Sequence, residues 1–176
     1  GGKNNVKNTF SMLFFNSSLV VVGIVIILFY QYFYKFFIFK DDTPNSLKYS
    51  KFCRYIGIIT GIMFSGIGFV PHDLDFTMHV FFANGAFLTL LILSIFHTLS
   101  FYNSNFIKSH YSYGYILFCI FLASYLYLIF LGPTIGPGKD FSQSDLTLQV
   151  VGQKLIIFTF TIAMIYQTEG IRRSLN

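Results

Sequence analysis

The sequence predicts an all-α integral membrane protein, a helical bundle with five transmembrane helices. Of the 176 residues, 54% are hydrophobic and only 11% are charged, whereas soluble domains carry about 25% charged residues. The hydrophobic residues form five runs of roughly 20 residues, which is the length that an α-helix needs to cross the hydrocarbon core. These runs are continuously apolar and do not alternate, so the pattern excludes the strands of a membrane β-barrel.

The five expected spans belong to one domain, residues 1–176, and polar segments separate them. We predict the spans at residues 11–34, 52–70, 77–101, 111–131 and 146–168. Pro44 stops helical continuation in the polar turn after the first span. Residues 142–145 read Ser-Gln-Ser-Asp, which resembles a capping box with Asp in place of Glu and predicts a helix start there.

Lysine and arginine residues predict how the bundle is oriented. Eight of them lie on one side of the expected spans, within residues 35–54, at Lys108, and at Arg172 and Arg173. Three lie on the other side, and the richer side is expected to be cytoplasmic. The C-terminus is then cytoplasmic and the N-terminus outside, in what we expect to be a prokaryotic plasma membrane. Because these charges flank apolar runs, we expect the lipid bilayer and not nucleic acid as the partner.

An outside N-terminus predicts a further segment upstream of Gly1. The chain begins without Met, and its first residues are polar and not a signal peptide. We therefore expect either a cleaved signal or a sixth helix before the first predicted span.

The loop between the second and third spans concentrates polar residues at the membrane rim. It reads Pro-His-Asp-Leu-Asp-Phe-Thr-Met-His over residues 71–79. Polar clusters at such positions often mark functional sites. Asp75 and His79 are four residues apart and share a helix face if the third helix begins by Asp75. The structural alternative is that Asp73 or Asp75 caps that helix while His79 forms a hydrogen bond within the bundle.

The fifth span adds Gln153 and Lys154 to this candidate ligand site. A lysine inside a span is costly, so Lys154 is expected to face the interior, to pair with an acid or to extend toward the rim. We expect its partner to be Asp75, then Asp73 or Asp145. The five candidate ligand-binding residues are therefore Asp73, Asp75, His79, Gln153 and Lys154.

A metal site is the alternative for the same loop. Asp73, Asp75 and His79 are plausible ligands for zinc or copper, but a site needs three or four converging groups. We predict no metal, no cofactor and no catalytic residue, because catalytic and phosphate-binding motifs are missing from the sequence. His79 and His97 also share a direction on the third span, yet a haem pair would need further ligands, so we interpret His97 as a histidine at the inner membrane interface.

The second span carries a face of small residues. Gly57, Gly61 and Ser65 follow one another at a spacing of four, which permits close approach of two helix backbones. We predict that this face packs against another helix. The alternative is a hinge near Gly66 and Gly68.

Several short motifs together resemble a known family. They are Phe-Phe-Asn at residues 14–16, Gly-Ile-Gly-Phe-Val-Pro-His-Asp at residues 66–73, His-Val at residues 79–80 and Gln-Lys at residues 153–154. The chain resembles domain-of-unknown-function family 998, uncharacterised prokaryotic membrane proteins distantly similar to DRAM-like (autophagy modulator) proteins. The resemblance implies a six-helix bundle, of which this chain contains five spans. It implies no activity.

These features lead to three hypotheses for the function. The first is a non-enzymatic membrane protein that binds a lipid or a small ligand at the polar outer face. The alternative is a structural or accessory subunit of a larger membrane complex, motivated by the small-residue face. A transporter is a weaker interpretation, because repeats and broken helices are not evident. An enzyme or metal protein that uses Asp75 and His79 is also a weaker interpretation.

Overall fold

The computed structural model describes residues 9–133, 135–136 and 139–175, and nearly all of them are helical. Five long helices are present: α1 (Thr9–Phe39), α2 (Pro44–Phe69), α3 (Phe76–Tyr102), α4 (Tyr113–Leu131) and α5 (Gln143–Leu175). A short 3₁₀ helix, η1 (Ser109–Ser112), leads into α4. All five long helices are long and apolar enough to cross a membrane. The predicted all-α membrane bundle is confirmed.

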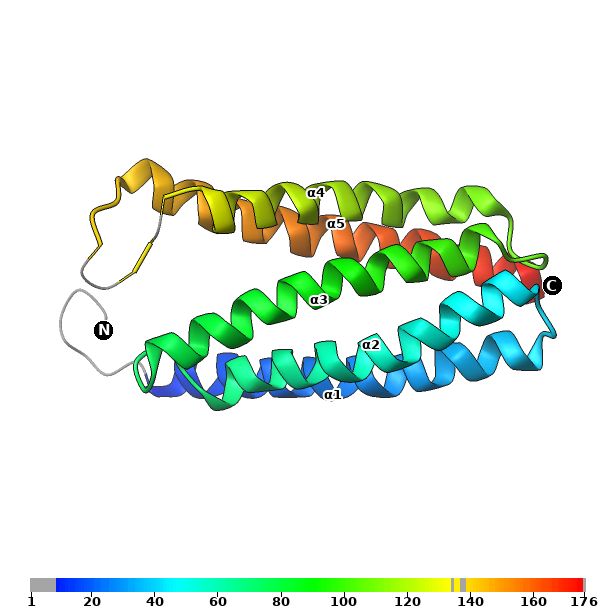
Figure 1. Cartoon of the computed structure of the whole chain (residues 1–176), viewed down its shortest axis with the longest axis horizontal. Coiled ribbons are helices and arrows are strands. Elements are labelled where there is room, and N and C mark those ends of the chain that lie inside the picture. The colour runs from blue at the N-terminus through cyan, green and yellow to red at the C-terminus, as the bar shows by residue number, and fades with distance from the viewer. Residues whose placement is uncertain (1–8, 134, 137–138, 176) are drawn as a thin grey trace.

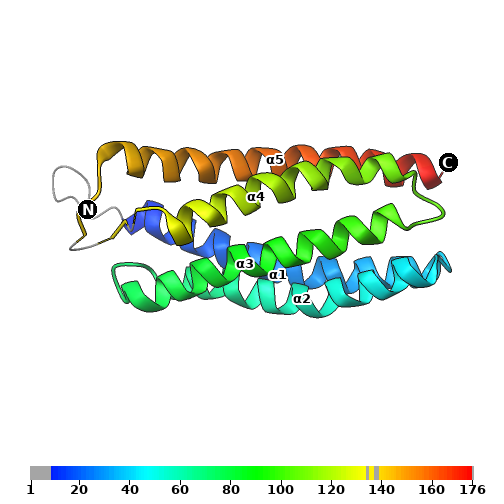
Figure 2. The same ribbon diagram turned by 45° about the horizontal axis from the view of Figure 1, so that its top comes forward.

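The helices form two groups that run side by side (Figure 1). Neighbouring helices α1, α2 and α3 pack successively against one another, and α4 pairs with α5. Figure 2 shows the α4–α5 pair covering one side of the other three. Only α3 and α4, together with η1, join the groups through close backbone approach. The position of α3 between both groups explains why its side chains form the centre of the molecule.

Several helix ends differ from the predicted spans. The helix α1 continues to Phe39 and α5 to Leu175, so both extend beyond their apolar segments. The helix α2 begins at Pro44, well before residue 52, because the Thr43 hydroxyl accepts a hydrogen bond from the Ser46 amide. Proline suits a first helical turn, where its missing N–H is not needed. Pro44 thus starts a helix as well as ending the continuation of α1.

Caps at the other helix starts follow the sequence. The Ser142 hydroxyl accepts a hydrogen bond from the Asp145 amide at 3.1 Å, and the Asp145 carboxylate accepts one from the Ser142 amide at 3.0 Å. This reciprocal pair confirms the predicted capping box.

The left-handed backbone of Asp41, with φ 48°, makes the tight turn between α1 and α2.

The connections alternate between the two ends of the bundle (Figure 1). The α1–α2 turn, the α3–η1 connection and the C-terminal end of α5 share one end, which we call the basic end because it carries the eight lysines and arginines counted above. The α2–α3 and α4–α5 connections lie at the opposite end. The segments predicted to lie on one side of the membrane thus share one end of the bundle, and the assignment of that end to the cytoplasm stays a prediction. The N-terminal residues 1–8, expected outside, lie beyond the described residues.

Candidate functional site

His97 is a fully buried polar side chain of the bundle. Its exposed fraction is 0%, although it carries two polar ring nitrogens. The ring of Tyr115 stacks on the imidazole with centroids 4.3 Å apart, and that of Phe33 stacks at 4.5 Å. Two nearly parallel rings this close to one imidazole must lie on opposite faces. His97 on α3 is therefore clamped between α1 and α4.

Both ring nitrogens of His97 are occupied by hydrogen bonds to other helices. Nε2 lies 2.7 Å from the Gln167 carbonyl oxygen Oε1 on α5, and Nδ1 lies 3.0 Å from the Tyr30 hydroxyl on α1. An amide oxygen carries no proton, so Nε2 must be the donor to Gln167. In the neutral imidazole Nδ1 is then the acceptor, and the Tyr30 hydroxyl donates to it. Neither nitrogen is left to hold a metal ion or to remove a proton from a substrate.

The central cluster, as we call Tyr30, His97, Tyr115 and Gln167, joins both helix groups. The helices α3 and α5 have no Cα atoms within 8 Å of each other, so the His97–Gln167 hydrogen bond bridges helices whose backbones stay apart. On α4 the Tyr115 hydroxyl reaches the Met164 sulfur of α5 at 2.7 Å. In an apolar core these side-chain bonds add directional contacts that dispersion forces do not supply.

Two buried polar atoms near the middle of this region have no partner among the described residues. They are the Gln167 amide nitrogen Nε2 and the Ser94 hydroxyl, and both residues are at most 3% exposed. Ser94 lies three residues before His97 on α3, so the two side chains share a helix face. A buried polar group without a partner costs about 1–3 kcal/mol. The core around His97 therefore has unused hydrogen-bonding capacity.

The interpretation of His97 as a histidine at the inner membrane interface did not include its complete burial in the bundle. It rested on the predicted end of the third span at residue 101, close to His97. The burial comes from neighbouring helices, which supply the stacked rings of Phe33 and Tyr115 and the hydrogen-bond partners Tyr30 and Gln167. Tyr30 and Gln167 were not predicted as site residues, because the pattern of one span does not indicate which side chains of other spans it will contact. Tyr30 lies about 13 Å before the end of α1, well within the bundle.

The two central residues of the predicted outer site have structural contacts. The Asp75 carboxylate accepts a hydrogen bond from the Met78 amide at 3.0 Å and caps α3. The His79 ring nitrogen Nδ1 lies 2.8 Å from the Val70 carbonyl oxygen. These contacts are the structural alternative expected from the sequence, in which an acid caps the helix and His79 bonds within the bundle.

The other predicted ligand residues lie apart from this pair. Asp73, Gln153 and Lys154 are exposed. Gln153 and Lys154 project from α5, whose backbone does not approach α3. Among the described residues Lys154 forms no ion pair, so the expected pairing of Lys154 with Asp75, Asp73 or Asp145 is wrong. Its exposure fits the alternative in which the lysine extends outward.

The structure also bears on the metal alternative. In the described ranges no three His, Cys, Asp or Glu side chains gather closely enough to hold a metal ion. The rings of His72 and His79 lie edge to face with centroids 6.0 Å apart. Asp75 meanwhile uses its carboxylate to cap α3, so the residues considered for a metal serve the local turn.

The small-residue face of α2 contacts α1. A side chain at Gly61 would collide with the Gly23 carbonyl oxygen, and one at Gly57 would meet the Tyr30 side chain. Gly23 in turn approaches Gly61 and Ser65. Close backbone contact of this kind is what a run of small residues permits in membranes. The face predicted for helix packing thus lies inside this chain, against its own first helix.

Comparison with known proteins leaves the family open. No family model matches the chain, and no curated protein and no solved structure matches it.

Proposed function

We propose that this protein is a non-enzymatic membrane protein that binds a lipid or a small ligand, and that the polar part of the ligand lies beside His97. The proposal rests on two buried groups that have no hydrogen-bond partner among the described residues, the Gln167 amide nitrogen and the Ser94 hydroxyl. A ligand that accepts a hydrogen bond from the Gln167 amide nitrogen and forms one with the Ser94 hydroxyl would offset the free-energy cost of burying both groups. The proposal concerns binding because both His97 nitrogens already have partners.

The central location is favoured over the outer loop by the geometry of the two regions. Around His97, buried polar groups lack partners, whereas at the outer loop Asp75 and His79 are bonded to the local backbone. Asp73 and Lys154 are exposed to solvent or lipid headgroups and carry no desolvation cost that a ligand could relieve. A site of Asp73, Asp75, His79, Gln153 and Lys154 therefore stays a sequence prediction with less support.

The alternative of an accessory subunit loses one of its two motivations. It rested on the lack of a catalytic motif and on the small-residue face of α2 as a surface for a partner. Because α1 occupies that face, the face gives no reason to expect another subunit.

Removal of the Ser94 hydroxyl tests the proposal, because ligand binding predicts that the variant retains less ligand. No described protein group bonds this hydroxyl, so Ser94→Ala breaks no bond within the chain. If a guest uses the hydroxyl, native mass spectrometry of the full chain released from lipid nanodiscs will show a retained non-covalent mass in the wild type and less of it in Ser94→Ala. Ser124→Ala is the matched control, because Ser124 is exposed and bonds only its own helix.

The opposite result is equally clear. If the core is dry, Ser94→Ala removes an unsatisfied polar atom and stabilises the fold, and no mass larger than water is retained by either protein. That outcome contradicts ligand binding at His97.

A further inference from the structure

A small pocket at the basic end of the bundle is lined partly by cationic side chains. It has a volume of about 250 Å³ and lies between η1 and the last turns of α5. Its lining includes Lys108, His110, Tyr111, Gly170, Arg173 and Ser174. Whole drug-sized ligands occupy pockets of roughly 300–1,000 Å³, so this one suits a headgroup. Its cationic rim indicates an anionic group.

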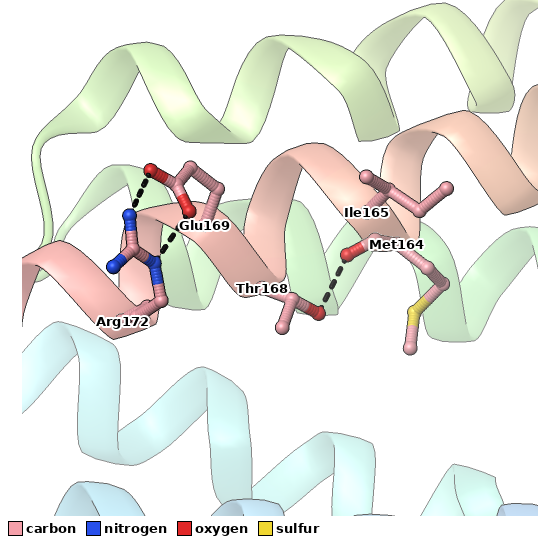
Figure 3. A pocket seen from close by; sticks show the side chains of 5 residues that line it. All are labelled: Met164, Ile165, Thr168, Glu169 and Arg172. Carbon is pink, nitrogen blue, oxygen red and sulfur yellow. Dashed lines mark hydrogen bonds and ion pairs between the residues drawn. The ribbon is translucent and has the colours of Figure 1, made fainter.

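The charges beside this pocket are only partly neutralised. Glu169 accepts hydrogen bonds from Arg172 at 2.7 Å and from Arg173 at 2.6 Å, and Figure 3 shows the Glu169 carboxylate turned toward Arg172. One carboxylate thus serves two guanidinium groups. Lys108 is exposed and has no ion pair among the described residues. Arg172 and Arg173 therefore share one carboxylate, and Lys108 has no carboxylate partner among the described residues.

A separate, mainly apolar depression lies along α5 and ends at Arg172, the neighbour of the pocket residue Arg173. It has a volume of about 350 Å³ and is lined by Met164, Ile165 and Thr168, with Glu169 and Arg172 at its end (Figure 3). A soluble phosphate ester has no apolar chain to cover the apolar surface beside the cations, whereas the acyl chains of a phospholipid can cover it. The charge excess also predicts that this end is cytoplasmic, where the leaflet is rich in anionic lipids.

We propose that the pocket of Lys108, His110 and Arg173 binds the phosphate headgroup of an anionic phospholipid, with the acyl chains outside along α5. Guanidinium and ammonium groups supply charge-assisted hydrogen bonds to phosphate oxygens. Tyr111 and Gly170 line one wall of the pocket, where the missing side chain of Gly170 lets the Tyr111 ring pack against the α5 backbone. This site goes beyond the central one and involves different residues.

The test compares two pairs of charge removals in the full chain. The protein is reconstituted in phosphatidylcholine nanodiscs with spin-labelled phosphatidylserine, and the motionally restricted lipid is measured by electron paramagnetic resonance against spin-labelled phosphatidylcholine. Lys108→Gln with Arg173→Gln removes the pocket cations. Lys48→Gln with Lys51→Gln is the control, because both lysines are exposed at the same end but outside the pocket.

We expect the wild type and the control to prefer phosphatidylserine, and the pocket variant to lose that preference by roughly fivefold for each charge removed. An equal loss of the phosphatidylserine preference in both variants would overturn the proposal, because general surface charge would then explain the preference. A wild type without any such preference would overturn it as well. Full displacement of the label by an equal concentration of soluble glycerophosphoserine would overturn the lipid assignment. Circular dichroism confirms that each variant is folded.

The two proposals fail separately. Loss of the phosphatidylserine preference with a retained central mass refutes only the headgroup pocket. A preserved preference without any retained mass in the wild type refutes only the site at His97.

Discussion

At the scale of single residues, the Tyr30 hydroxyl has the clearest structural role. It donates to a fully buried His97 nitrogen that no other described group bonds. Tyr30 also contacts the glycine face of α2 at Gly57. One side chain thus links the central cluster to the packing of α1 on α2.

Tyr30→Phe keeps the ring and removes only this donor, so we expect a loss of about 1–2 kcal/mol in the free energy of unfolding. Reversible unfolding in mixed detergent micelles measures it. Tyr32→Phe is the control, because Tyr32 is 67% exposed on the same helix. Equal stability of Tyr30→Phe and the wild type would show that the hydrogen bond contributes nothing.

Asp75 separates capping from ligand binding at the outer loop. Its carboxylate bonds the Met78 amide, and removal of an N-cap costs about 1 kcal/mol. We expect Asp75→Ala to lower the unfolding free energy by this amount and Asp73→Ala to leave it unchanged, as measured in the same unfolding assay. A comparable loss in Asp73→Ala would indicate that both acids share a role, as the sequence-based site requires.

At the scale of helices, the contact between α1 and the small-residue face of α2, which we call the α1–α2 seam, requires the two backbones to lie close together. The prediction of a packing face at Gly57, Gly61 and Ser65 needed only the spacing of small residues, because that spacing is a local property of one helix. The identity of the partner helix could not be predicted in this way. Any other helix could in principle have covered the face.

Two glycine substitutions test the seam against helix propensity. An alanine at Gly61 would meet the Gly23 backbone oxygen, which cannot move aside cheaply, whereas one at Gly85 would meet the flexible Met63 side chain. Alanine favours a helix by about 1 kcal/mol over glycine. We expect Gly61→Ala to destabilise the protein and Gly85→Ala to be neutral or stabilising in thermal unfolding. A stable Gly61→Ala protein would contradict the close packing of α1.

At the scale of the whole molecule, the number of helices and the grouping of their ends could be predicted, but the centre could not. Apolar runs of about 20 residues identify spans irrespective of their neighbours. His97, Tyr30 and Gln167 belong to three different spans, and their side chains meet only in the assembled bundle. The unusual burial of a histidine is therefore a tertiary property, which no single helix contains.

The orientation is predicted from charge alone and has its own test. In a background with Cys53→Ala and Cys119→Ala, a cysteine replacing Lys108 is expected to react with a membrane-impermeant maleimide only in inside-out vesicles. A cysteine replacing Asp73 is expected to react only in right-side-out vesicles. The reverse labelling pattern would invert the assignment and would place the basic pocket in the outer leaflet.

The central claim is that the buried cluster around His97 holds a guest. An experimental density map of the protein in lipid nanodiscs tests it most directly. We predict non-protein density larger than a water molecule within about 3.2 Å of the Gln167 amide nitrogen and in contact with the Ser94 hydroxyl. A core in which these two atoms face only protein, or a single water, would contradict the proposed binding function.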